Sequence, residues 1–107
     1  MLPPVCPPNP TRWDSQVMDL LAKYPRAWAA FCRFVFDEIH AGEKRVGAKA
    51  AWEHMRYRAR IELRETGDQW ALNNSLTASF PRIFAATYPE LAAVFETRKR
   101  PTERRAA

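Results

Sequence analysis

The chain has 107 residues, of which 47% are hydrophobic and 12% aromatic, which is enough for one packed core but not for two. Its net charge of +5 suits a phosphate backbone or an acidic protein surface. No segment approaches the ~20 apolar residues of a membrane-spanning helix, and the N-terminal residues lack the basic start and apolar core of a signal peptide. We therefore expect a single-domain cytoplasmic protein with no membrane contact.

Residues 1–12 form a proline-rich arm, with five prolines between positions 3 and 10. Because proline does not fit a helix interior, the arm is predicted to be extended. It either drapes passively over the domain, which is the interpretation we favour, or binds an SH3-like groove. A first helix is expected over residues 14–23, where Asp14 places a carboxylate near the positive end of the helix.

The second helix is expected to run from Pro25 to His40, because proline ends the preceding helix and is tolerated in a first turn. Its apolar residues follow the i, i+3, i+4 rule, which predicts the main core stripe. These residues are Trp28, Phe31, Cys32, Val35, Phe36 and Ile39. Gly42 closes the helix.

A tryptophan-containing helix is predicted over residues 47–65. At 100° per residue it has two apolar faces, which suits a helix in the middle of a small bundle or one that presents a side to a partner. One face holds Ala48, Trp52, Met55, Ala59 and Leu63, and the other holds Ala50, His54, Tyr57 and Ile61. A basic stripe lies between the faces, interrupted only by Glu53. It consists of Lys49, Arg56, Arg60 and Arg64.

Residues 68–74 are too short and mixed for a helix, so an extended loop or a brief, wing-like strand is expected around Trp70. A fourth helix then runs to about Thr87. If it begins at Asn74, Pro81 lies in its interior and kinks it; if Ser79 is the N-cap, Pro81 falls in the first turn. The pattern is compatible with both.

A fifth helix is expected over residues 90–99, and residues 100–107 form a basic tail that we expect to be disordered. The sequence thus predicts an extended arm over residues 1–12 and one helical domain over residues 13–99. The expected fold class is all-α, a bundle of four to five short helices with the 47–65 helix at its centre.

Three segments of the chain carry a family resemblance: GAKAAWEHMRYRARIE, WALNNSLTASFPRIF and YPELAAVFETRKR. Together they resemble a pattern of small uncharacterised phage and prophage proteins, in which an arginine–aromatic pair is followed by an asparagine doublet and a short arginine-containing helix. The matching residues are Arg56, Tyr57, Asn73, Asn74, Arg82, Ile83, Phe84, Pro89, Phe95 and Arg98. Pro81 departs from the pattern, which favours an aromatic residue or a good helix former there. The resemblance implies a phage-type origin and no specific activity.

Enzyme signatures are missing from the sequence. The three scattered glycines cannot build a phosphate-binding loop, and His40 and His54 have no metal-ligand spacing. Cys6 and Cys32 form neither a disulfide framework nor a zinc motif. We therefore expect a non-enzymatic protein without metal or cofactor.

Nucleic-acid binding is the first functional hypothesis. The basic stripe would follow a phosphate backbone, and Arg98 in the basic C-terminal region would add attraction. Asn73, Asn74 and Arg82 would supply polar contacts. The competing interpretation of the stripe is a solvated helix face, in which glutamates three or four residues away pair with its cations.

A non-enzymatic inhibitor or adaptor that binds a host protein is the second hypothesis. Aromatic residues and arginines are favoured interface anchors, and the chain has more aromatic residues than one core needs. The expected anchors are Phe34, Tyr57 and Trp70, with ordinary core packing as the alternative role. The two apolar faces of the 47–65 helix also suit a homodimer.

Overall fold

The computed structural model describes residues 1–95, and residues 96–107 lie outside the described part. Its α-helices are α1 (Arg12–Lys23), α2 (Pro25–His40), α3 (Ala48–Thr66) and α4 (Ser79–Thr87), and its 3-10 helices are η1 (Asn74–Leu76) and η2 (Pro89–Phe95). No strand occurs between residues 1 and 95, so the segment around Trp70 is a loop rather than part of a wing. The predicted fold class, a small all-α domain of short helices, is confirmed. Arg98, the predicted end of the fifth helix and the basic tail lie outside the described residues.

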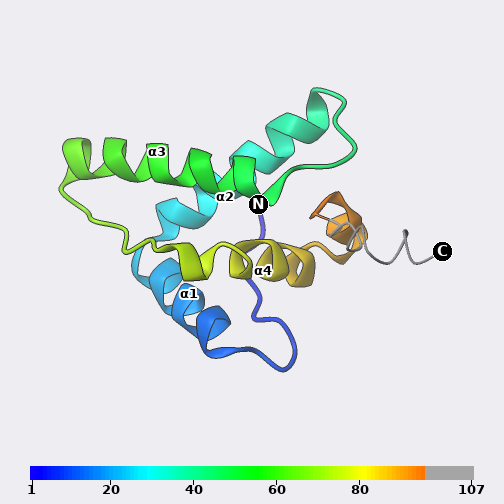
Figure 1. Ribbon diagram of the computed structural model, residues 1–107, viewed down its shortest axis with the longest axis horizontal. Helices are drawn as coiled ribbons and strands as arrows, with labels where there is room; N and C mark the ends of the chain where they lie inside the picture. Colours follow the sequence, from blue (N-terminus) through cyan, green and yellow to red (C-terminus); the bar gives the residue numbers. More distant parts are fainter. Residues whose placement is uncertain (96–107) are drawn as a thin grey trace, which may run out of the picture.

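The helices pack in a simple order. In Figure 1, α4 lies between α3 on one side and α1 on the other, and α2 crosses behind and packs against both α1 and α3. The short η2 helix folds back against α4. Among residues 1–95, no element covers the outer side of α3, which is the side turned away from α4 and α2.

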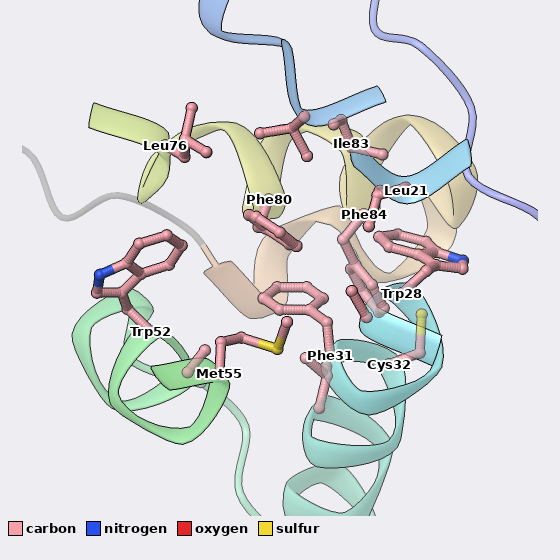
Figure 2. Close-up of a cluster of buried hydrophobic side chains, with 14 of the residues drawn as sticks. Leu21, Trp28, Phe31, Cys32, Trp52, Met55, Leu76, Phe80, Ile83 and Phe84 are labelled. Atoms are coloured by element: carbon pink, nitrogen blue, oxygen red, sulfur yellow. The ribbon is translucent and has the colours of Figure 1, made fainter. Parts of the chain in front are cut away.

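An aromatic cluster fills the space between α2, α3 and α4. The Phe31 ring centroid lies 5.2 Å from that of Phe80 and 5.7 Å from that of Phe95. Trp52 of α3 joins the cluster through an edge contact with Phe80 at 5.8 Å. Figure 2 shows Trp52 and Met55 pointing from α3 toward Phe31 and Phe80. This contact determines which side of α3 faces the core.

The first helix begins two residues earlier than predicted because Thr11 caps it. The Thr11 hydroxyl accepts a hydrogen bond from the Asp14 amide at 3.1 Å, and the Asp14 carboxylate accepts one from the Thr11 amide at 2.9 Å. This reciprocal capping box satisfies two backbone donors of the first turn. The Asp14 carboxylate also accepts a hydrogen bond from Arg82 Nη2 at 2.7 Å, which joins α1 to α4.

The fourth helix starts late, so Pro81 falls in its first turn and needs no kink. The N-cap is Ala78, the residue that precedes the predicted cap Ser79. Asn73 instead caps the preceding 3-10 helix, η1: its Oδ1 accepts a hydrogen bond from the Ser75 amide at 2.9 Å. Of the two alternatives for this segment, the late start is the correct one.

The proline-rich arm lies against the domain. The Leu2 amide donates a hydrogen bond to the Tyr88 hydroxyl at 2.6 Å, and the Leu2 carbonyl accepts one from Trp28 Nε1 at 2.9 Å. Farther along, the Val5 amide donates to the Thr87 hydroxyl at 2.9 Å. These bonds hold the arm on the side of α2 and α4, as the draping interpretation predicted.

Candidate nucleic-acid interface

The basic stripe lies on the outer side of α3. The helix turns Ala51, Trp52, Met55 and Glu62 into the protein, and all four are buried. At 100° per residue, the basic stripe falls within an arc of about 80° on the opposite side. Lys49, Arg56, Arg60 and Arg64 are all exposed. The predicted outward orientation of the stripe is therefore found in the structure.

The flanks of the stripe differ from the prediction, because α3 buries one face rather than two. Trp52 and Met55 are in the core, but Leu63, predicted on the same face, is 49% exposed. On the second predicted face Tyr57 is 52% exposed, and His54 is only half-buried beneath the Phe34 ring, at 4.7 Å between centroids. In Figure 1 the C-terminal turns of α3 extend past α2 and α4, so their apolar residues have no core to enter. The helix lies at the edge of the bundle, not at its centre.

The cations of the stripe have no acidic partners in the described part of the chain. Across residues 1–95 no ion pair involves Lys49, Arg56, Arg60 or Arg64. The Arg60 guanidinium instead lies over the Tyr57 ring, 5.9 Å from its centroid. The solvated-face interpretation required glutamates of α3 to pair with these cations, and this pairing is not found. The cations of the stripe are therefore held in no ion pair among residues 1–95, although the exposed Glu53 lies on the same side of the helix.

Glu62 is not available to the stripe because it faces inward. Its side chain is 1% exposed and accepts two hydrogen bonds from Arg26 of α2, at 2.7 Å from Nε and 3.0 Å from Nη2. The hydrogen bond from Arg26 lowers the pKa of Glu62 below its ordinary value, although burial opposes this shift. The two-pronged Arg26–Glu62 pair fixes α3 against α2 and so helps to set the outward direction of the stripe.

Sequence reasoning missed the role of Glu62, although a signal was present. Glu62 follows Met55 by seven residues, or two helical turns, and so lies on the same face as a predicted core residue. A carboxylate at such a position requires a buried or reaching cation. The partner, Arg26, could not be identified from periodicity, because it lies on another helix.

A groove of about 440 Å³ separates α2 from α3 on the other side of the helix, and it is also rich in arginine. These arginines are already paired. Arg26 and Arg58 lie 2.7 Å and 3.9 Å from Glu62, and Arg33 lies 3.5 Å from Asp37. This difference in pairing makes the stripe, and not the groove, the candidate site for an anion. An anion in the groove would compete with carboxylates, whereas an anion at the stripe would not.

Trp70 lines this groove and is not a surface anchor. It is 5% exposed, and among the described residues its indole Nε1 has no hydrogen-bond partner. The loop after α3 folds back and buries the ring against the helices, so Trp70 is not the exposed aromatic anchor that the sequence predicted. Phe34 is half-buried on His54. Of the three predicted aromatic anchors, only Tyr57 is exposed.

The predicted polar contacts divide into two groups. Asn73 and Asn74 are exposed, and Asn74 Oδ1 accepts a hydrogen bond at 3.4 Å from Nε1 of Trp52, which lies on the buried face of α3. Arg82 lies elsewhere. Its guanidinium is bound to the buried Asp14 carboxylate between α4 and α1, on the side of α4 that faces away from α3 (Figure 1). The structure therefore joins Asn74 to the buried face of α3 and gives Arg82 a structural partner, so neither prediction of a polar contact beside the stripe is supported by a contact among residues 1–95.

No helix within residues 1–95 is long and apolar enough to cross a membrane. No group of three or more histidines, cysteines or acidic residues in the same range could hold a metal ion.

Comparison of the chain with models of protein families, with curated proteins and with solved structures finds no match. The resemblance to small phage and prophage proteins stays a prediction.

Proposed function

We propose that this chain is a small, basic, phage-type protein that associates with nucleic acid by binding the phosphate backbone through the basic stripe of α3. One observation carries the proposal: the cations of the stripe are exposed on one side of a fixed helix, and no acidic residue among residues 1–95 pairs with them.

The spacing of the stripe supports contact with a linear polyanion. Arg56, Arg60 and Arg64 follow one another at four-residue intervals, which correspond to about 6 Å along the helix axis. A strand lying along α3 would meet successive guanidinium groups. Since these groups hold no carboxylate, a phosphate contact breaks no ion pair within the described protein. Binding would be driven by release of the counterions that surround the nucleic acid.

We expect the exposed asparagines to add polar contacts where a bound strand extends beyond α3. Asn73 and Asn74 are exposed at the start of η1, and Asn74 is bonded to Trp52 of α3. The oxygen atom of each side chain accepts a hydrogen bond within the protein, which leaves the amide nitrogens free to donate to phosphate or sugar oxygens. Contacts of this kind position a strand without reading its sequence.

The rival proposal is a non-enzymatic inhibitor or adaptor that binds a host protein through the same side of the molecule. It has less support, because Trp70 is buried and Phe34 is half-buried, which leaves Tyr57 as the one exposed aromatic anchor of the predicted set. The two proposals differ in their response to salt. An aromatic contact with a protein would change little with ionic strength, whereas phosphate binding would weaken steeply.

A matched pair of triple variants tests the proposal. Arg56→Gln, Arg60→Gln and Arg64→Gln remove three charges from the stripe. Arg12→Gln, Lys23→Gln and Lys44→Gln remove three exposed charges from α1 and the loop before α3, so both variants have the same net charge. We expect the stripe variant to bind a labelled 20-base-pair duplex about tenfold or more weakly than the control variant at low salt. Equal affinities of the two variants, with circular dichroism confirming that both are folded, would contradict the proposal.

A further inference from the structure

Tyr57 is an unusual residue of the outer side of α3. Among residues 1–95 it is the only exposed aromatic side chain; the rings of the other described aromatic residues are buried or half-buried in contact with the core or with one another. Tyr57 belongs neither to the core of the described residues nor to the half-buried residues packed against that core. Its environment is cationic, because it directly follows Arg56 and lies three residues before Arg60.

The ring is partly held in place by the stripe itself. The Arg60 guanidinium lies over the ring, 5.9 Å from its centroid, within the range of a cation–π contact. More than half of the residue is still exposed, at 52%. The ring therefore offers a flat, solvent-facing surface next to cations that have no acidic partner within the described residues.

We infer that Tyr57 is a stacking platform for an unpaired nucleobase, so that the basic stripe binds single-stranded nucleic acid in preference to duplex. This inference rests on the proposed function. Proteins that bind single strands combine a positive track for the phosphates with exposed aromatic rings on which bases stack. In a duplex the bases stack on one another and their faces are not available to Tyr57. The stripe alone would bind both forms; the ring adds a contact that only an unpaired base makes.

The test compares four labelled oligonucleotides of equal length at one low salt concentration: a mixed-sequence DNA strand, the same sequence in RNA, a DNA strand of abasic residues, and the DNA duplex. The abasic strand keeps the phosphates and removes the bases. We expect the wild-type protein to bind the strands with bases more tightly than the abasic strand or the duplex. Comparison of the DNA and RNA strands shows which of them the surface prefers, and the inference holds for either.

Three variants assign the preference to the ring. Tyr57→Ala is expected to lower affinity for the base-containing strands by about tenfold and to leave the abasic strand and the duplex unchanged. Tyr57→Phe, which keeps the ring, should retain the wild-type preference. Leu63→Ala, which removes another exposed apolar side chain from the same helix, should have no effect. Both positions are at the surface, so the three variants are expected to fold.

The outcomes separate the inference from the proposed function. If Tyr57→Ala binds the base-containing strands as tightly as the wild type, or loses the abasic strand to the same extent, the stacking platform is wrong, while stripe-dependent binding of the duplex would still support phosphate binding. If the wild-type protein binds none of the four oligonucleotides, both fail.

Discussion

At the scale of single residues, the position of the stripe depends on how the protein uses its acidic groups. Asp14 and Glu62 are both buried, and each accepts hydrogen bonds from an arginine of another helix, Arg82 and Arg26 respectively. Burial raises the pKa of Asp14, but hydrogen bonds from the Thr11 backbone, Ser79 and Arg82 outweigh this effect, so that its pKa is lowered. The carboxylates of Asp14 and Glu62 thus each join two helices, and they do not pair with the cations on the outer side of α3.

The first prediction at this scale concerns Glu62 and pH. The pKa of Glu62 in the folded protein lies below the ordinary value of 4.5, so the carboxylate stabilises the fold fully above that value and stops doing so as pH falls through the lower, folded pKa. We expect Glu62→Gln to reduce the free energy of unfolding at pH 7 by about 1 kcal/mol, because Arg26 remains hydrated and weakens the pair. The difference from the wild type should shrink below about pH 4.5, since a protonated glutamate resembles glutamine.

Urea denaturation between pH 7 and pH 3 measures this difference. Asp37→Asn provides the control, because the Arg33–Asp37 pair at 3.5 Å is exposed on both sides and is expected to contribute little. A gap between Glu62→Gln and the wild type that stayed constant down to pH 3 would show that the Glu62 charge does not stabilise the fold.

At the scale of elements, the end of α3 determines where the following loop goes. Gly67 has a φ of +81°, a left-handed conformation that ends the helix, and its amide donates a hydrogen bond to the Leu63 carbonyl at 3.1 Å. The chain can then turn back and bury Trp70. No atom lies within 4 Å of a Cβ added at this position, so a substitution would be opposed by the backbone conformation and not by crowding.

The positive φ of Gly67 leads to a second prediction about stability. Gly67→Ala should lower the free energy of unfolding by about 1 kcal/mol, because alanine is strained at positive φ. Gly67→Asn should lose less, because asparagine tolerates the left-handed region. Thermal or chemical denaturation of the two variants measures the difference. Equal stabilities of Gly67→Ala and the wild type would mean that the left-handed end of α3 does not constrain the fold.

Much of the element pattern could be predicted, because it depends on local rules. The core stripe of α2, the glycine end of α3 and the basic stripe follow from periodicity and backbone conformation alone. Periodicity could not show that the last turns of α3 extend past the bundle, so Leu63 was expected in the core and is exposed. Likewise the burial of Trp70 and the Asp14–Arg82 pair depend on contacts between distant segments, which spacing along one element does not reveal.

At the scale of the whole molecule, the two sides of the bundle have different roles. The proline-rich arm lies against α2 and the end of α4, and the Asp14–Arg82 pair joins α1 to α4, so that both tie the N-terminal segments to the C-terminal helices. The outer side of α3 carries the basic stripe and Tyr57. The asymmetry arises because the buried acids Asp14 and Glu62 pair with arginines of other helices, while the exposed cations of the α3 stripe have no such partners among residues 1–95.

The salt dependence of nucleic-acid binding tests the phosphate contact most directly. Each phosphate that the protein contacts releases counterions, so the slope of log affinity against log salt counts the contacts. For a 20-base-pair duplex we expect a slope of about −3 for the wild-type protein, from three to four contacts at ~0.9 each. The variant Arg56→Gln, Arg60→Gln and Arg64→Gln should retain a slope of about −1 or less in magnitude. Affinity that did not depend on salt, or the same slope for both proteins, would contradict phosphate binding by the outer side of α3.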